Sequence, residues 1–257
     1  MQWSKLISSE RLGQPHAREI KEFRTDFQRD YDRLIFSSPF RRLQNKTQVF
    51  PLPGSVFVHN RLTHSLEVSS VGRSLGNDIA RALLTRHPNL KDTSINVLGL
   101  IVSTGCLAHD LGNPPFGHSG ERAIASYFSQ GTGAKIKNII YQEYGPEIGE
   151  IIWKDITFFD GNANAFRLLT HQFEGRRKGG YVMTYSVLAS IVKYPFSSLM
   201  TNKQKFGFFY SEMEYYKEIA QSLGLPCIKD DGLRIQYARH PLAYLVEAAD
   251  DICYEIM

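Results

Sequence analysis

Apolar and small residues recur at three- and four-residue spacings in the first half of the chain, and this pattern predicts two helices. The first covers residues 62–84, where one face is formed by Leu62, Leu66, Ser69, Gly72, Leu75, Ile79, Ala80 and Leu83. Charged side chains such as Arg73 and Asp78 fall largely off this face, as in an amphipathic helix. The second helix begins after the polar residues 92–94 and runs through an apolar stretch to Asp110. It ends at residues 112–115, Gly-Asn-Pro-Pro, because consecutive prolines cannot continue the hydrogen-bond ladder of a helix.

Two further helices are predicted, at residues 122–128 and from Pro241 to the end of the sequence, where apolar residues recur at Leu242, Leu245, Ala248 and Ala249. Residues 130–135, 175–180 and 226–232 are predicted loops, and residues 206–210 are aromatic enough for a short strand or a buried turn. We therefore expect a mainly α fold without a clear domain boundary. Because the last helix reaches Met257 without a C-cap, we also expect the chain to continue beyond this residue.

Composition excludes several classes of protein. The chain has 257 residues, of which 42% are hydrophobic and 12% aromatic, so a disordered or low-complexity protein is excluded. The longest stretch without a charge, residues 93–109, is shorter than the roughly 18 to 20 apolar residues of a membrane span. The N-terminus carries charges where a signal peptide would be apolar. We therefore expect a soluble cytoplasmic protein that does not associate with membranes.

Charge and cysteine usage narrow the chemistry only slightly. The three cysteines form no CxxC pair, which argues against a disulfide framework or a zinc ribbon. The net charge of +4 suits an anionic substrate or a nucleic acid without favouring either.

Histidines and aspartates on the predicted helices are candidate metal ligands. His64, the adjacent pair His109 and Asp110, and Asp250 together offer two imidazoles and two carboxylates. This set suits a divalent ion such as Mn²⁺, Fe²⁺, Zn²⁺ or Mg²⁺. Adjacent residues lie about 100° apart around a helix, so one ion fits in the angle between them. The local pattern alone leaves another interpretation open, in which His109 caps a helix and Asp110 interacts with the dipole of a neighbouring one.

Six blocks of the sequence resemble, in order and spacing, one known family. They are DYDRLIFSSPFRRLQNKTQVFP (30–51), HNRLTHSLEVSSVGRSLG (59–76), AHDLGNPPFGHSGE (108–121), DGNANAFR (160–167), KFGFFYSE (205–212) and EAADDICY (247–254). The sequence resembles the HD-domain deoxyguanosine triphosphate triphosphohydrolases, the dGTPase-like group of the HD superfamily of metal-dependent phosphohydrolases. The resemblance implies one HD domain over residues 1–257, a helical bundle with an N-terminal arm and helical insertions. The arm would cover about residues 1–45, the metal-site core about 46–128 and 236–257, and a helical and loop segment about 129–235.

The resemblance also assigns roles to individual residues. The metal ligands would be His64, His109, Asp110 and Asp250, with the first aspartate of the Asp250–Asp251 pair preferred. His118 and Glu121 match the catalytic histidine–glutamate pair of the family. Substrate contacts would come from Arg61 to phosphate, Gln48 near the deoxyribose 3′-hydroxyl, and Tyr254 beside the sugar and phosphates.

The implied activity is cleavage of a deoxynucleoside triphosphate, with dGTP favoured, into a deoxynucleoside and tripolyphosphate. The implied cofactor is Mn²⁺ or Mg²⁺, with Fe²⁺, Zn²⁺ or Ni²⁺ as other candidates. The implied partners are further copies of the chain in a homo-oligomer, and single-stranded DNA or a dNTP as effector. Two alternatives stay open: an HD phosphohydrolase for another nucleotide, and a non-catalytic sensor of nucleotides or single-stranded DNA. The extended blocks at 30–37 and 112–121 argue against the first, and the complete set of ligands with the His118–Glu121 pair argues against the second.

Overall fold

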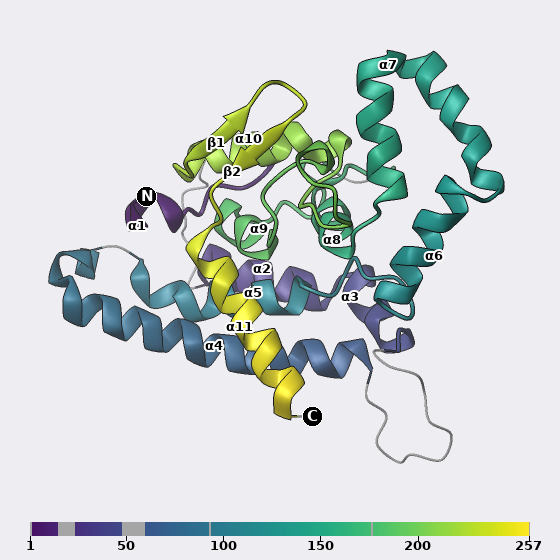
Figure 1. Cartoon of the computed structure of the whole chain (residues 1–257). Helices are drawn as coiled ribbons and strands as arrows, with labels where there is room; N and C mark the ends of the chain where they lie inside the picture. Colours follow the sequence, from purple (N-terminus) through teal and green to yellow (C-terminus); the bar gives the residue numbers. More distant parts are fainter. Residues whose placement is uncertain (1, 15–23, 48–59, 93, 176, 257) are drawn as a thin grey trace, which may run out of the picture.

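The computed structural model describes residues 2–14, 24–47, 60–92, 94–175 and 177–256, and these ranges form a mainly α-helical fold (Figure 1). The predicted fold class is therefore confirmed. The α-helices in these ranges are α1 (Trp3–Leu6), α2 (Asp26–Ile35), α3 (Ser38–Arg42), α4 (Arg61–Arg86), α5 (Leu98–Ala108), α6 (His118–Ser129), α7 (Ile136–Thr157), α8 (Gly161–Thr170), α9 (Tyr185–Ile191), α10 (Met213–Ser222) and α11 (Pro241–Ile256). Strands β1 (Cys227–Asp230) and β2 (Ile235–Tyr237) form an antiparallel pair.

Helix α5 is the centre of the fold. Every one of its residues except Leu100 is buried, as expected for a helix that is apolar on all sides. It packs against α4, α2, α9 and α11, and α11 crosses α4 in Figure 1. The end of α5 therefore lies where several helices meet.

The contact between α4 and α5 is unusually close because glycines line it. A Cβ atom on Gly76 would lie 2.7 Å from Cα of Gly99. Further along, the Ser69 and Ser103 hydroxyls form a hydrogen bond of 2.7 Å. From the first contact to the second, the residue number falls from 76 to 69 on α4 and rises from 99 to 103 on α5. The two helices therefore run antiparallel. This arrangement brings the start of α4 beside the end of α5.

Most of the predicted helices are confirmed, with shifted ends. The helix expected at 62–84 is α4, the one expected at 122–128 is α6, and the last is α11. The second predicted helix is shorter than expected, since a 3₁₀ turn at Ile95–Val97 precedes α5, and α5 ends at Ala108.

Two of the predicted loops were wrong in part. Residues 226–232 contain β1, whose four residues are all exposed, so the strand lacks the apolar alternation that would have indicated it. Residues 130–135 include a 3₁₀ helix at Thr132–Lys135. Residues 206–210 form the buried turn rather than the strand, with Phe206 and Phe208 in the interior.

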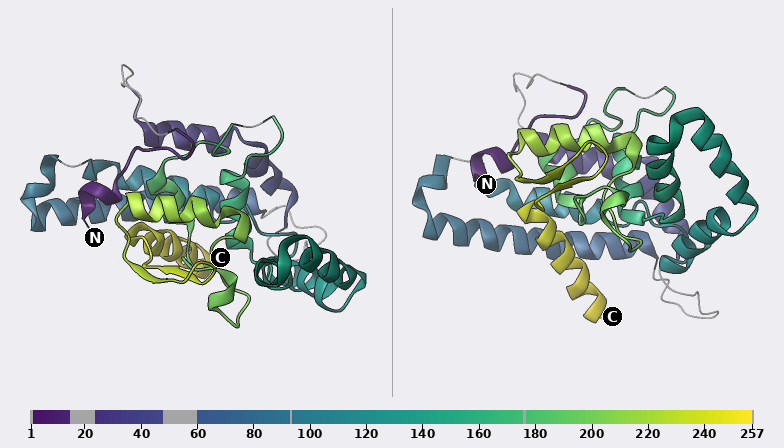
Figure 2. Two further views of the ribbon diagram at one scale, coloured as in Figure 1. Left: turned by 90° about the horizontal axis from the view of Figure 1, so that it is seen from above. Right: turned by 45° about the horizontal axis from the view of Figure 1, so that its top comes forward.

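Helices α6 and α7 lie to one side of the α4–α5 pair, as the views in Figures 1 and 2 agree. Helix α7 is kinked at Gly145, whose φ of 77° interrupts the helix directly before Pro146. The segment returns to the body of the protein through α8. Among the described helices, none is at once long and apolar enough to cross a membrane.

Candidate metal centre

Three helices deliver the candidate ligands to one point. His64 lies in the first turn of α4, which Asn60 caps through a hydrogen bond from the Thr63 backbone to its side chain. His109 directly follows α5 with helical backbone angles, and Asp250 lies on α11. The expectation that each ligand sits within a helix was wrong for His109 and Asp110, which lie in the turn after α5 because the helix already ends at Ala108.

The side chains of His64, His109 and Asp250 form a compact cluster. Their ligand atoms lie within 4.8 Å of one another. Oδ1 of Asp250 is 2.9 Å from Nε2 of His64 and 3.5 Å from Nε2 of His109. The two imidazole rings meet edge to face with their centroids 5.5 Å apart. Nitrogen and oxygen donors thus converge from α4, from the turn that follows α5, and from α11.

The chemistry of this cluster fits a divalent metal ion. Nδ1 of His109 hydrogen-bonds the Cys106 carbonyl at 2.6 Å, which fixes the ring and directs Nε2 toward Asp250, as in many metal-ligating histidines. Nε2 of His109 is buried, and it has no hydrogen-bond partner among the described residues. A buried nitrogen left in this state is costly, and a metal ion would satisfy it.

The charges within the cluster are strongly coupled. Burial would raise the pKa of Asp250, but the neighbouring imidazoles of His109 and His64 hold it well below its usual range. Burial would lower the pKa of His109, but the carboxylates of Asp110 and Asp250 raise it to about 9. In the absence of an ion the cluster therefore favours an imidazolium beside carboxylates, and a metal cation would replace that proton.

Asp110 lies at the edge of the cluster, with Oδ1 3.6 Å from Nε2 of His109. Its Oδ2 accepts a hydrogen bond of 2.6 Å from Nη1 of Arg61, and the Asn113 amide donates to its Oδ1. The role of Asp110 as a fourth ligand stays a prediction. Arg61 is buried in this ion pair, so its expected contact with phosphate also stays a prediction.

The predicted pair of His118 and Glu121 is formed at the start of α6. Nδ1 of His118 lies 2.7 Å from Oε2 of Glu121. The other carboxylate oxygen of Glu121 accepts a hydrogen bond of 2.8 Å from the backbone N–H of Gly161, the first residue of α8. Glu121 is buried while His118 is largely exposed. The buried carboxylate therefore positions an imidazole that solvent and small molecules can reach.

A cavity of about 250 Å³ lies between the cluster and the pair. Its lining includes His109, Asp110 and Asp250 on one side and His118 and Glu121 on another. This cavity also contains Asn162, Lys193 and Lys205, and the sequence pattern alone indicated no role for the two lysines. Asn162 and Lys205 belong to the blocks at 160–167 and 205–212, which was the only signal for them in the sequence.

The two lysines bring positive charge to this cavity. The ammonium group of Lys193 pairs with Glu247 at 2.6 Å. That of Lys205 is 3.9 Å from Oδ2 of Asp160. The cavity thus combines a candidate cation site, a histidine and two ammonium groups, which suits an anionic substrate with several phosphates.

The remaining substrate-binding candidates are placed differently. Gln48 lies outside the described residues. Tyr254 lies on α11 one turn after Asp250, but it is 63% exposed and does not line the cavity. Lys46, in contrast, reaches the turn after the ligands, where Nζ donates to the carbonyls of Leu111 at 3.1 Å and Asn113 at 2.8 Å.

Comparisons with known proteins identify the family and several similar proteins. The family model described as HD domain matches residues 61–194. The chain is 44% identical over 266 residues to a deoxyguanosinetriphosphate triphosphohydrolase-like protein of Pseudomonas aeruginosa. The aligned region covers 100% of the chain and 56% of that protein. A protein of the same name from Synechocystis is 42% identical over 267 residues, covering 100% of the chain and 59% of that protein.

A protein named deoxyguanosinetriphosphate triphosphohydrolase from Yersinia enterocolitica is also similar. It is 34% identical over 278 residues, covering 95% of the chain and 51% of that protein. The chain thus spans somewhat more than half the length of the curated relatives it matches.

Proposed function

The chain belongs to the HD-domain family, and on that basis we propose that it is a metal-dependent hydrolase of deoxynucleoside triphosphates. The favoured substrate is dGTP, and the products are a deoxynucleoside and tripolyphosphate. The observation that carries the proposal is the cavity that His109 and Asp250 share with His118 and Glu121. The names of the similar proteins support the choice of substrate.

The metal would be held by His64, His109 and Asp250, with Asp110 as the fourth ligand. Mn²⁺ or Mg²⁺ is the proposed ion, and Fe²⁺, Zn²⁺ or Ni²⁺ would also suit two imidazoles and carboxylates. A divalent ion bound there supplies positive charge that neutralises phosphate oxygens and polarises the phosphorus.

The protein's own residues bind the phosphates and move the proton. Lys193 and Lys205 lie in the cavity with ammonium groups that would bind the outer phosphates once they exchange their carboxylate partners. Attack of water on the α-phosphorus releases the 5′-oxygen of the nucleoside, which needs a proton. His118 is the group for this transfer or for taking the proton of the attacking water, because histidine changes its charge near neutral pH. Glu121 holds the ring through Nδ1 and leaves Nε2 for the transfer.

The finer aspects of the proposal concern the whole protein. We propose that it acts in the cytoplasm as a homo-oligomer, with single-stranded DNA or a dNTP as effector. Gln48, Arg61 and Tyr254 are its proposed further substrate contacts.

Product analysis with matched variants tests the proposal. The metal-loaded protein is incubated with each of the four dNTPs, and anion exchange separates the products. Asp250→Asn and His109→Ala remove ligands, whereas Asp251→Asn changes the neighbouring exposed carboxylate and serves as the control. We expect tripolyphosphate and a deoxynucleoside from the unaltered protein and from Asp251→Asn, and loss of both products in the two ligand variants.

Other results would contradict specific parts of the proposal. Formation of pyrophosphate and a deoxynucleoside monophosphate would contradict the proposed products. No turnover together with tight binding of a dNTP or single-stranded DNA, by protein whose bound metal has been verified by mass spectrometry, would contradict hydrolysis and favour the sensor.

A further inference from the structure

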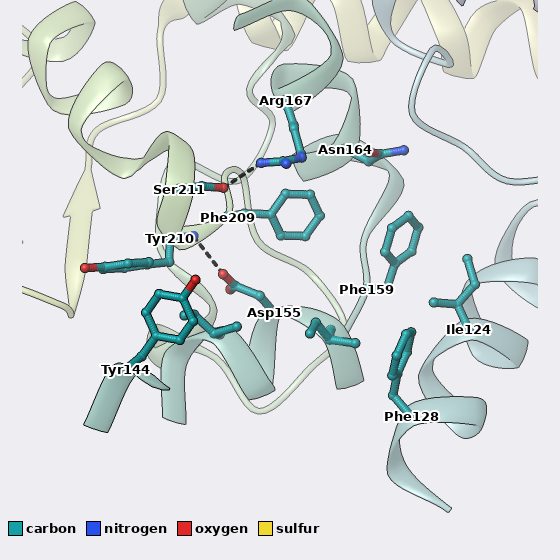
Figure 3. A pocket seen from close by; sticks show the side chains of 12 residues that line it. Ile124, Phe128, Tyr144, Asp155, Phe159, Asn164, Arg167, Phe209, Tyr210 and Ser211 are labelled. Atoms are coloured by element: carbon teal, nitrogen blue, oxygen red, sulfur yellow. Dashed lines mark hydrogen bonds between the residues drawn. The ribbon is translucent and has the colours of Figure 1, made fainter. Parts of the chain in front are cut away.

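A second cavity, of about 510 Å³, lies where α6, α7 and α8 meet the segment around Tyr210 (Figure 3). We call it the aromatic cavity. It does not contain any of the candidate metal ligands or the His118–Glu121 pair. Its volume is typical of sites that bind small organic molecules.

The walls of the aromatic cavity are mainly apolar rings and aliphatic side chains. Phe128, Phe159 and Phe209 line it together with Ile124 and Tyr144 (Figure 3). The rings of Phe159 and Phe209 are tilted, with their centroids 6.1 Å apart. Such surfaces suit a flat ring, which can stack on one aromatic side chain and meet another edge to face.

The aromatic cavity also contains one buried carboxyl group, that of Asp155. Asp155 is 4% exposed, and its Oδ2 accepts a hydrogen bond of 2.7 Å from the backbone N–H of Tyr210. Its Oδ1 is buried beside the Ser198 hydroxyl, and the side chain lines the cavity. A carboxyl oxygen can accept more than one hydrogen bond, so a ligand that donates an N–H to this carboxyl would be favoured.

Among the described lining residues, the one guanidinium is that of Arg167, and it already has partners. Arg167 pairs with the buried Glu212 at 2.6 Å and donates to the Ser211 hydroxyl at 2.7 Å. Lysine and histidine do not occur among the described lining residues. The aromatic cavity therefore offers no uncommitted positive charge for a phosphate, which argues against a nucleotide as its ligand.

Two walls of the aromatic cavity belong to the helices that support the catalytic pair. Helix α6 carries Glu121 one turn before Ile124, and α8 begins with Gly161, whose N–H binds Glu121. The amide of Asn164, another lining residue, donates to the Gly112 carbonyl at 2.8 Å, two residues after Asp110. A ligand in the aromatic cavity thus contacts elements that are hydrogen-bonded directly to the active-site residues.

We propose that the aromatic cavity binds an uncharged planar heteroaromatic compound with a ring N–H, and that its occupancy shifts the position of Glu121 through α6 and α8. Binding itself does not depend on the proposed hydrolytic function. Only the consequence for Glu121 rests on it.

Indole is a suitable probe because it is flat and uncharged and carries one ring N–H. Benzofuran is its matched analogue, in which an oxygen acceptor replaces the N–H. Binding to the protein is measured by saturation-transfer NMR without any nucleotide. Ile124→Trp fills the cavity, while Ile139→Trp places the same ring at an exposed position of α7 outside it.

We expect saturable binding of indole to the unaltered protein and to Ile139→Trp, and loss of this binding in Ile124→Trp. Benzofuran should bind about tenfold more weakly, because it cannot donate to Asp155. Where circular dichroism shows that Ile124→Trp does not fold, Ile156→Trp fills the same cavity from α7. Unsaturable binding of indole, equal binding to the filled variant, or equal affinity for benzofuran would overturn the proposal. The proposal would also be overturned if light scattering showed that the unaltered protein is a dimer, that Ile124→Trp dissociates it, and that indole does not bind. The cavity would then be a contact surface between two copies of the chain.

The effect on Glu121 has its own readout. The amide signal of Gly161 in ¹H–¹⁵N spectra should shift as indole saturates the cavity, because this N–H binds Glu121 directly. An unchanged Gly161 signal at saturation would contradict the proposed effect on Glu121 but not the proposed binding site. Failure of dNTP hydrolysis would affect neither measurement, so the two proposals fail separately.

Discussion

Glu121 accepts a hydrogen bond of 2.7 Å from Nδ1 of His118, although the two side chains differ greatly in exposure, at 6% and 73%. The buried partner is itself fixed by the N–H of Gly161 at 2.8 Å. An exposed histidine on a glycine-flanked helix start would otherwise sample many orientations. The carboxylate therefore orients the accessible ring, as the proposed proton transfer by His118 would require.

Removal of either member of this pair should lower kcat to different extents. In His118→Ala we expect kcat for dNTP hydrolysis to fall by about a hundredfold or more, since general acid–base catalysis contributes on that scale. Glu121→Gln keeps an acceptor for Gly161 but loses the negative charge beside the ring, and its kcat should fall less, by about tenfold. Steady-state kinetics measure both, with His87→Ala at the exposed end of α4 as the control. Equal activity of His118→Ala and the control would contradict the assignment.

Lys46 should act as a positioning residue for the turn that carries Asp110. Its ammonium group donates to the carbonyls of Leu111 and Asn113, and burial lowers the pKa of Lys46. Lys46→Met keeps the aliphatic stem but leaves both carbonyls without this donor, so we expect the free energy of unfolding to fall by about 1–3 kcal/mol. We also expect weaker metal binding in titration calorimetry.

The control for this prediction is Lys91→Met, which changes an exposed lysine far along the chain from the turn. Lys46→Arg should recover part of the loss, because a guanidinium can also donate to both carbonyls. If Lys46→Met binds the metal as tightly as Lys91→Met, Lys46 does not position the turn.

The sequence pattern predicted the helices that have one exposed and one buried face. Helices α4 and α11 follow this rule, since their apolar residues recur at helical spacing. The pattern did not predict α7, where Gly145 and Pro146 interrupt the chain and only a few residues are buried. Strand β1 was missed for a similar reason, because all of its residues face solvent. Local patterns report burial, and elements that bury little leave a weak signal.

For the candidate site, the sequence predicted the types of some residues but not their arrangement in space. The types of His64, His109 and Asp250 indicated metal chemistry, but their spacing could not show that three helices bring them within 4.8 Å. The resemblance to a family supplied that expectation. Lys193 and Lys205 were not singled out, because a lysine becomes part of a site only through the tertiary contacts that place it in a cavity. Arg61 illustrates the same point, since only the structure shows its ion pair with Asp110.

The close contact of α4 and α5 should not tolerate even a methyl group. In Gly76→Ala the new Cβ would lie 2.7 Å from Cα of Gly99 and 2.9 Å from its backbone nitrogen, and a backbone cannot move aside as a flexible side chain does. We expect the free energy of unfolding to fall by about 1–3 kcal/mol in urea titrations. Ser74→Ala, on an exposed position of the same helix, is the control. Equal stabilities of the two variants would show that the helices separate at little cost.

Two buried groups should oppose each other in the pH dependence of stability. His240 is fully buried, with Nε2 donating to the Leu6 carbonyl and Nδ1 accepting from the Leu242 N–H, each at 3.2 Å. Protonation would remove that acceptor, and burial lowers the pKa of His240 to about 4. Burial raises the pKa of Asp155 to about 7.

The signs of the two effects follow from which state binds the proton. When the pH falls from 7 to 5, the unfolded chain binds a proton at His240 and the folded protein does not. This difference lowers the free energy of unfolding by about 2 kcal/mol. Over the same range the folded protein takes up a proton at Asp155 that the unfolded chain does not, which raises it by about 2 kcal/mol. Urea titrations of metal-free protein at both pH values measure these two opposing effects by comparing each variant with the unaltered protein. Relative to the unaltered protein, Asp155→Asn should lose stability on acidification and His240→Asn should gain it, because only one of the two opposing groups remains in each variant. Parallel behaviour of both variants and the unaltered protein would mean that neither group changes its pKa on folding.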